Sequence, residues 1–248
     1  MRVAALADVH GNAVALSATS EEVVAAAPDL IVSLGDVTWG PLPEDTWELV
    51  RALCDAFTGR THFVRGNAER SLSELRRKER SEASARERWM LAEHAASTLD
   101  AFERFPDGVI VDIDGLGPTR FCHGSPRSDE ELITPATPSR RMRELLVGVT
   151  ERILVTAHTH IQFDHVTQGV RSVNPGSVGV PYQGQPGAYW ATLGPDVELR
   201  RTEYDLELAV ARYRETGDPL VETMIETLLE PPKLREVIAH AEALEFSG

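Results

Sequence analysis

Seven residues of this sequence have side chains that bind metal ions well, and they stand in five short motifs. Their carboxylate, amide and imidazole groups offer the oxygen and nitrogen donors that divalent ions use in proteins. The seven residues are Asp8, His10, Asp36, Asn67, His123, His158 and His160. Each alone has an ordinary explanation, since an aspartate after a strand often makes a turn and a lone histidine is usually structural. All seven, however, follow segments of strand character, and this shared setting predicts one metal site.

The spacing of these residues favours their convergence on one point. Asp8 and His10 are two positions apart, as are His158 and His160. In extended backbone, alternate residues project to the same side, so the members of each pair are expected to face the same point. Glycine permits tight turns and close backbone approach, and it adjoins four of the motifs, at Gly11, Gly35, Gly66 and Gly124.

The elements that would position these residues alternate between strands and helices. Short apolar strands are predicted at 1–7, 30–35 and 61–66, with helices between them at 12–27 and 45–57. This βαβαβ order predicts a parallel sheet with right-handed crossovers, and therefore an α/β fold. Ligands of such sheets bind beyond the carboxyl ends of the strands, where the first four candidate ligands stand.

The rest of the chain is less regular. Residues 71–102 are rich in charges of both signs and are predicted to form one long helix or two, largely exposed to solvent. The second half is rich in strands, with one helix at about 139–149. From Asp205 onward two or three helices are predicted, with breaks near 217–219 and at 231–232. We therefore expect one domain over 1–248, with a catalytic sandwich at 1–204 and a helical extension at 205–248.

The composition is that of an ordinary globular protein. The 248 residues are 42% hydrophobic and carry a formal net charge of −14 at pH 7. This acidity argues against a nucleic acid or an anionic membrane held by bulk charge. No stretch is long and apolar enough to span a membrane, and the start runs directly into a strand, so neither a span nor a signal peptide is predicted. The two cysteines, Cys54 and Cys122, are too few for a disulfide scaffold, and a reduced, cytoplasmic protein is expected.

Read in order, the motifs are D-x-H at Asp8–His10, G-D-x-x-x-G at Gly35–Gly40, G-N at Gly66–Asn67, H-G at His123–Gly124 and H-T-H at His158–His160. In this order they resemble the calcineurin-like metallophosphoesterase superfamily, and their combination is specific although each motif alone is weak. The likeness covers about three-quarters of the chain. It includes N-P-G-S at Asn174–Ser177, which resembles the small bacterial and archaeal phosphodiesterases. The resemblance implies a four-layer sandwich, with two β-sheets flanked by helices and two metal ions at the edge.

The resemblance also implies which residues hold which ion. The first ion would be bound by Asp8, His10, Asp36 and His160. The second would be bound by Asp36, Asn67, His123 and His158, so that Asp36 bridges the two ions. Mixed nitrogen and oxygen donors fit Mn, Fe, Zn, Co or Ni, and we expect Mn to support activity in assays.

A metal-bridging hydroxide is the nucleophile that such a site implies. Metal binding lowers the pKa of water enough to supply hydroxide near neutral pH, and the ions stabilise the phosphoryl oxygens. Two divalent ions leave the site net positive, so it would attract phosphate within an acidic protein. The expected function is hydrolysis of phosphate esters, by a phosphodiesterase in particular, with Asp36, Asn67 and His123 as catalytic residues. A covalent serine mechanism is disfavoured because the sequence has no G-x-S-x-G elbow.

The third motif departs from the superfamily pattern. Many members continue it as G-N-H followed by an acid, and that histidine is the usual candidate for protonating the leaving group. Here the run is Gly66-Asn67-Ala68-Glu69, and alanine cannot donate a proton. Good leaving groups are therefore favoured, in diesters of activated alcohols or in phosphoanhydrides. The expected partner is a small phosphorylated molecule, nucleotides included, and the oligomeric state stays open.

Two alternatives accompany the phosphodiesterase hypothesis. One is an enzyme that hydrolyses dinucleoside polyphosphates or other phosphoanhydrides. The other is a non-catalytic scaffold of the same fold that binds protein partners. The complete set of seven ligands favours an enzyme, because a scaffold has no reason to keep them all.

Several other residues have both a functional and a structural interpretation. Arg127 is a candidate for bidentate contact with substrate phosphate or an ordinary surface arginine. Glu69 would orient a ligand or serve as an acid at a helix start. Trp39 and Tyr182 are candidates for stacking on a nucleobase, although packing is favoured. Cys122 is expected in the core, and the remaining histidines are assigned structural roles: His62, His94, His165 and His240.

Overall fold

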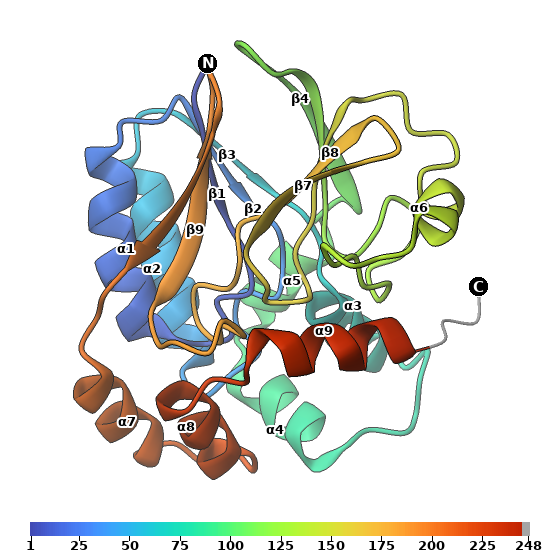
Figure 1. Cartoon of the computed structure of the whole chain (residues 1–248). Coiled ribbons are helices and arrows are strands. Elements are labelled where there is room, and N and C mark those ends of the chain that lie inside the picture. Colours follow the sequence, from blue (N-terminus) through green and yellow to red (C-terminus); the bar gives the residue numbers. More distant parts are fainter. Residues whose placement is uncertain (245–248) are drawn as a thin grey trace.

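The computed structural model describes residues 1–244, which form two β-sheets that face each other with helices on both outer sides (Figure 1). The first sheet contains, in spatial order, β10 (Val197–Thr202), β9 (Ala188–Leu193), β1 (Val3–Leu6), β2 (Leu30–Ser33) and β3 (Arg60–Phe63). The second contains β4 (Gly108–Ile113), β5 (Gly117–Cys122), β6 (Ile153–Val155), β8 (Val170–Asn174) and β7 (Phe163–Thr167). This is the four-layer α/β sandwich that the resemblance implied.

Strand β1 shows how the sequence separates the layers. All four of its residues are buried. Ala4 and Leu6 pack in the cluster beneath the helices, whereas Val3 and Ala5 pack in the cluster between the two sheets. The alternation follows because successive side chains of a strand point to opposite faces. A strand with two covered faces reads as the continuous apolar run seen in the sequence.

Each sheet contains a run of three parallel strands. β1, β2 and β3 are parallel, as the βαβαβ order predicted, and β5, β6 and β8 are parallel in the second sheet. The antiparallel strands β9, β10, β4 and β7 lie toward the margins. The loops that leave β1, β2, β3, β5 and β6 meet at one edge of the sandwich, because residues of these loops contact one another there.

Helices α1 (Ala13–Ala25) and α2 (Pro43–Ala56) cover the outer face of the first sheet (Figure 1). Asn12 caps α1 and accepts a hydrogen bond from the N–H of Ala15 at 3.0 Å, which leaves fewer unpaired backbone donors at the helix start. Proline at the first position of α2 suits a helix start, because that residue needs no amide donor. On the second sheet, α6 (Ser139–Leu145) packs through Met142 and Leu145.

The segment 71–102 contains more helices than the one or two that were predicted. It forms three helices, α3 (Asn67–Arg76), α4 (Ala85–Glu93) and α5 (Ala96–Phe102). Each also buries apolar side chains, among them Leu72, Met90 and Phe102. Ser84 starts a new helix by accepting a hydrogen bond from the N–H of Glu87. The dense charges of 71–88 concealed the apolar positions between them.

The C-terminal segment forms three helices, α7 (Leu206–Arg214), α8 (Val221–Leu229) and α9 (Leu234–Ala243), with breaks where they were predicted. α7 and α8 pack in one cluster with Ala13 and Leu42, and α9 packs through Val237 and Ile238 near Tyr182. The last four residues of the predicted extension, 245–248, lie outside the described residues. Within 1–244, none of the helices is both long and apolar enough to cross a membrane.

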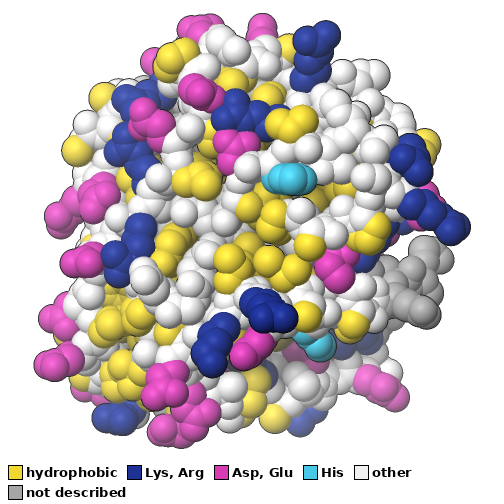
Figure 2. Space-filling model, viewed as in Figure 1, with side chains coloured by type: hydrophobic (Ala, Val, Ile, Leu, Met, Phe, Trp, Pro, Cys, Tyr) yellow, Lys and Arg dark blue, Asp and Glu magenta, His cyan; other side chains and the backbone are white. Residues whose placement is uncertain are grey.

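Charged side chains of both signs cover the face seen in Figure 2, and acidic ones gather along its left and lower-left margin, over α1 and α7. Hydrophobic side chains are visible near the centre of the same face. The acidic net charge is therefore not spread evenly over this face.

Candidate metal centre

The edge where the parallel strands end brings all seven predicted ligands together. Asp8 and His10 follow β1, Asp36 follows β2, and the others come from α3 and from the loops after β5 and β6. The N–H of Asp8 donates to the carbonyl of Gly35 at 3.1 Å, and that of His10 donates to the carbonyl of Asp36 at 3.0 Å. The first two ligand loops are therefore joined by backbone hydrogen bonds beyond the end of the sheet.

The backbone at these ligands differs from the extended conformation that the spacing suggested. Five ligands have positive φ angles: Asp8 at 52°, His10 at 49°, Asp36 at 51°, His158 at 64° and His160 at 56°. The prediction that extended backbone aligns each pair is therefore wrong. The side chains converge because the chain turns through left-handed residues, each of which costs roughly 1–3 kcal/mol unless its surroundings hold it. Such residues tend to cluster at functional sites.

The first group of donors comprises Asp8, His10 and His160, whose candidate ligand atoms all lie within 4.8 Å of one another. The Nε2 atoms of the two histidines are 3.0 Å apart. Asp8 Oδ2 accepts a hydrogen bond from the N–H of His158 at 3.0 Å. Its Oδ1 is buried and has no hydrogen-bond partner among residues 1–244, but lies 3.6 Å from His160 Nε2. A buried carboxylate oxygen beside two imidazole nitrogens is the arrangement that a cation would complete.

The second group comprises Asp36, His123 and His158, with candidate ligand atoms within 4.8 Å of one another. Asn67 joins it, since its Oδ1 lies 3.0 Å from His123 Nε2. Asp36 stands between the groups: Oδ1 is 3.6 Å from His123 Nε2, and Oδ2 is 3.6 Å from His10 Nε2. The structure thus brings all seven predicted residues to one place.

The imidazole rings are oriented by backbone carbonyls. Nδ1 of His10 donates to the carbonyl of Trp39 at 2.9 Å, and Nδ1 of His123 donates to that of Leu34 at 2.6 Å. Nδ1 of His160 donates to the carbonyl of Val180 at 2.6 Å. A carbonyl only accepts hydrogen bonds, so each Nδ1 carries the proton and each Nε2 presents a lone pair. These three histidines therefore have the tautomer that a metal ligand needs.

Burial sets the charge of the site. It lowers the pKa of both His10 and His158 to about 3, so these rings are neutral near pH 7. Burial, together with the charge of Asp36, raises the pKa of Asp8 well above its ordinary value. Burial likewise raises the pKa of Asp36. Two carboxylates without a cation are thus disfavoured here, and a divalent ion would reverse that preference. The donor set fits divalent metal ions.

Glu69 supports the site through a role that the sequence suggested only in outline. The side chain is buried and accepts three backbone hydrogen bonds of 2.9 Å, from the N–H groups of Asp36, Val37 and Gly66. It is an acid in the first turn of α3, as its position predicted. It also holds the loop that carries Asp36. The sequence predicted an acid at a helix start or a residue that orients a ligand, but only the fold brings Val37 within reach.

Ala68 occupies the position where superfamily members often have histidine. Its side chain is buried, and its N–H donates to Asp36 Oδ1 at 2.9 Å. The backbone at this position therefore still orients the central aspartate, although the side chain offers no proton. Gly66 lies close by, and a Cβ there would stand 2.2 Å from Asp36 Oδ1. Only glycine leaves room for the carboxylate at this position.

The N-P-G-S run supports the ligand loops from behind. The amide nitrogen of Asn174 donates to the carbonyl of Ala157 at 2.9 Å and to Thr159 Oγ1 at 3.0 Å. The hydroxyl of Ser177 donates to the carbonyl of Asp8 at 2.6 Å. Sequence reasoning recognised this run by its likeness, but gave it no role.

The other candidate residues lie around the site. The ring of Tyr182 stacks on that of His160, with centroids 4.6 Å apart, so it packs on a ligand. His94 Nε2 lies 2.8 Å from the hydroxyl of Thr38 and thereby supports the loop after β2, while Cys122 is buried as expected. Arg127 is paired with Glu131 at 2.6 Å, and its contact with substrate stays a prediction.

A cavity of about 280 Å³ adjoins the second group of donors, and we call it the arginine cavity. Its lining comprises Arg65, Arg70, Asp107, His123, Ser125, Pro126, Arg127, Ser128 and Asp129. Asn67 and His158 are only half-buried, whereas the residues of the first group are almost wholly buried. The cluster of seven candidate ligands is therefore more exposed on the side of the second group.

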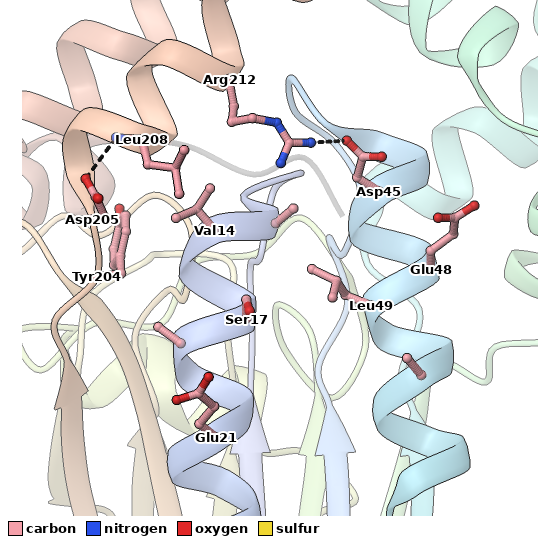
Figure 3. A pocket seen from close by; sticks show the side chains of 13 residues that line it. Val14, Ser17, Glu21, Asp45, Glu48, Leu49, Tyr204, Asp205, Leu208 and Arg212 are labelled. Carbon is pink, nitrogen blue, oxygen red and sulfur yellow. Dashed lines mark hydrogen bonds and ion pairs between the residues drawn. The ribbon is translucent and has the colours of Figure 1, made fainter.

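A larger hollow of about 700 Å³ lies elsewhere, between α1, α2 and α7, and we call it the helix groove (Figure 3). Its lining comprises Ala13, Val14, Ser17, Ala18, Glu21, Asp45, Glu48, Leu49, Ala52, Tyr204, Asp205, Leu208 and Arg212. Arg212 reaches across its upper end to Asp45, with which it forms an ion pair of 2.6 Å. None of the seven predicted ligands lines this groove.

Comparisons with known proteins agree with this geometry. The family model for the calcineurin-like phosphoesterase superfamily domain matches residues 1–194. A hypothetical protein from Pyrococcus horikoshii OT3 has the same fold, with 21% identity, coverage of 94% of this chain and 99% of its own, and a TM-score of 0.80. A metallophosphoesterase from Sphaerobacter thermophilus is 28% identical, with coverage of 93% of this chain and 99% of its own and a TM-score of 0.72. No curated protein matches the sequence.

Proposed function

Because the chain belongs to the calcineurin-like phosphoesterase superfamily and is a hydrolase of phosphoric esters, we propose that it acts as a metal-dependent phosphodiesterase with two divalent ions. The observation that carries this proposal is the position of Asp36. Its two carboxylate oxygens face different donor groups, each at 3.6 Å from an imidazole nitrogen. A carboxylate so placed can bridge two ions.

The proposed ligands follow from the two groups. One ion would be held by Asp8, His10, Asp36 and His160, and the other by Asp36, Asn67, His123 and His158. Divalent ions bound there would supply a water nucleophile at neutral pH and offset the charge of the phosphoryl oxygens. We propose manganese as the ion for assays, since the mixed donors accept it.

Residues of the chain divide the remaining tasks. Asp36, Asn67 and His123 are the proposed catalytic residues, because they belong to the second group, on the more open side of the cluster. Glu69 and the N-P-G-S run keep the ligand loops in place. Position 68 supplies no acid, so substrates whose leaving group departs without protonation are favoured: diesters of activated alcohols and phosphoanhydrides.

We also propose that the chain works as one domain. Helices α7 and α8 share a hydrophobic cluster with Ala13 of α1 and Leu42, so the extension packs on the sandwich. The catalytic sandwich then comprises 1–204 and the extension 205–248. A cytoplasmic location stays a prediction from the composition.

Hydrolysis of chromogenic esters tests the proposed function. Protein treated with a chelator is assayed with bis-p-nitrophenyl phosphate and p-nitrophenyl phosphate, before and after Mn²⁺ is restored. We expect activity only with the ion, and more on the diester. His123→Ala should lose most of it, whereas His240→Ala, an exposed residue of α9, should keep it.

Other outcomes would favour the alternatives. Wild-type protein that binds the ion but cleaves neither chromogenic ester nor any nucleotide anhydride would support a scaffold. Cleavage of anhydrides alone would support the anhydride hydrolase, the second candidate that Ala68 favours.

A further inference from the structure

Three arginines line the arginine cavity, beside the proposed ligand His123. The chain has only 25 Lys and Arg against 39 Asp and Glu, so three guanidinium groups at one cavity are notable in an acidic protein. Their hydrogen bonds distinguish them, because two of the three donate several hydrogen bonds to neighbouring carboxylates.

Arg70 and Arg127 hold the loop that forms one wall of the cavity. Arg70 forms ion pairs with Asp129 at 2.7 Å and with Glu74 at 3.0 Å. Arg127 donates to both carboxylate oxygens of Glu131, whose side chain is only 6% exposed. These carboxylates are partly or wholly buried, so their arginines are not readily released. The two arginines in turn offset part of the carboxylate charge on this wall.

Arg65 is engaged much less. Its Nη2 pairs with Asp107, whose side chain is 85% exposed. Its Nε is buried and has no hydrogen-bond partner in the described part of the chain. Exposed ion pairs contribute about 0–1 kcal/mol, so an incoming anion can replace Asp107 at small cost. Because Nε is buried, the edge that can turn to phosphate once Asp107 is displaced is the terminal one, formed by Nη1 and Nη2, which also binds phosphate bidentately.

The position of Arg65 relates it to the leaving group. It stands two residues before Asn67, and its N–H donates to the carbonyl of Pro106 at 2.8 Å, which fixes its backbone beside the cluster. Ala68 offers no proton to a leaving group. A leaving group that departs unprotonated carries negative charge, and a guanidinium next to it stabilises that charge as it develops.

We infer that Arg65 binds the phosphate that leaves when an organic pyrophosphate is cleaved, an inference that rests on the proposed function. Organic diesters of pyrophosphate are then the preferred substrate class. In the reaction, the bond between the attacked phosphorus and the bridging oxygen breaks. The bridging oxygen keeps the electron pair and departs with the second phosphate. Water supplies the new oxygen on the attacked phosphorus, and its protons pass to the product phosphates and the solvent.

A comparison of two substrates tests this inference. ADP-ribose contains a pyrophosphate, whereas bis-p-nitrophenyl phosphate releases an activated alcohol without a second phosphate. We expect Arg65→Gln to lower the ratio of kcat/KM for ADP-ribose to that for the chromogenic diester by about tenfold or more. Arg65→Lys, which keeps the charge but not the two-donor edge, should lose less. Arg60→Gln, at the exposed start of β3, is the matched control and should leave the ratio unchanged.

The outcomes separate this inference from the function on which it rests. If wild-type protein cleaves the chromogenic diester but not ADP-ribose, or if Arg65→Gln leaves the ratio unchanged, the leaving-phosphate site is wrong and the phosphodiesterase stands. If wild-type protein cleaves neither substrate with Mn²⁺ restored, the proposed function itself fails. A loss in Arg65→Gln that falls on kcat for ADP-ribose indicates contact with charge developing in the transition state. A thermal melt of each variant shows whether the fold is kept.

Discussion

The arginine cavity and the helix groove are both hollows of this molecule, and they differ in almost every property except that both are open to solvent. The helix groove is larger, about 700 Å³ against about 280 Å³. Its charged lining consists of four carboxylates and Arg212, which is already paired. Phosphate would meet repulsion there. The smaller cavity is lined by the buried His123 and by Arg65, whose ion-pair partner Asp107 is exposed.

Volume is therefore a poor guide to the reactive part of this protein. The candidate centre is marked instead by a buried carboxylate oxygen without a hydrogen-bond partner, Asp8 Oδ1, and by backbone held in left-handed conformations, as at Asp8 and His10. Both features cost stability and persist where the surroundings enforce them. The helix groove has neither: its lining residues are mostly ordinary helix positions with small or exposed side chains.

Substitution of one aspartate beside the arginine cavity and one in the helix groove should give the largest difference in kcat. Asp36→Asn removes the charge between the two donor groups, and we expect kcat to fall by roughly 10³-fold, which corresponds to about 4 kcal/mol. Asp45→Asn removes an exposed carboxylate of the helix groove, and hydrolysis should stay within about twofold. Steady-state kinetics with bis-p-nitrophenyl phosphate measures both. A similar loss in Asp45→Asn would show that the groove takes part in the reaction.

A buried ion pair near the C-terminal helices should affect stability without affecting chemistry. Asp218 is buried before α8, and its carboxylate pairs with Arg86 at 2.6 Å. Asp218→Asn leaves a buried guanidinium without its counter-charge, so the free energy of unfolding should fall by about 3 kcal/mol. Chemical denaturation measures this loss, while kcat at 20 °C should stay within about threefold. A large loss of kcat at unchanged stability would tie these helices to catalysis.

Substitutions of Glu69 and Glu48 compare a buried carboxylate at the candidate metal centre with an exposed carboxylate in the helix groove. Glu69→Gln loses part of the bonding to three backbone N–H groups, so the loop of Asp36 is held less firmly. We expect Mn²⁺ affinity to fall by about 10–100-fold, as for other residues that orient metal ligands. Glu48→Gln should leave the affinity unchanged. Calorimetric titration of chelator-treated protein checks both, and equal affinities in wild type and Glu69→Gln would remove its positioning role.

The smallest effect concerns a carboxylate that belongs to neither hollow. Hydrogen bonds from Arg80, and from Ser84 and Ser71, hold the pKa of Glu87 at about 2 against an ordinary value of 4.5. Because the folded-state pKa is the lower one, the stabilisation is present above pH 4.5 and is lost as the pH falls toward 2. Since the pair lies near the surface, Glu87→Gln should lower the free energy of unfolding by about 1 kcal/mol at pH 7. Denaturation at pH 7 and at about pH 2 tests this, and a difference that is undiminished at the lower pH would contradict it.

The sequence predicted the centre better than it predicted its surroundings. The order of the motifs identified all seven residues that the structure brings together, because strand ends of a parallel sheet meet at one edge. The reason given for the convergence of Asp8 and His10 was wrong, since turn conformations at ligands do not follow from spacing. The three helices of 67–102 were obscured by charge density, which conceals short apolar faces.

Other features depend on contacts between distant segments. Glu69 reaches Val37, and Asp107 reaches Arg65, only because the chain returns to the same edge. The helix groove exists because α7 packs against α1 after the last strand. No local pattern encodes such meetings, so the arginine cavity and the exposed ion pair of Arg65 could be found only from the structure.

Metal content tests the central claim most directly. Purified protein is stripped with a chelator, equilibrated with Mn²⁺, desalted and analysed by plasma mass spectrometry. We predict about two ions per chain in the wild type and a clear reduction in His160→Ala, with bis-p-nitrophenyl phosphate hydrolysis rising in step with the bound ion. A wild-type chain that retains no ion, or that hydrolyses the diester equally well without one, would contradict the account.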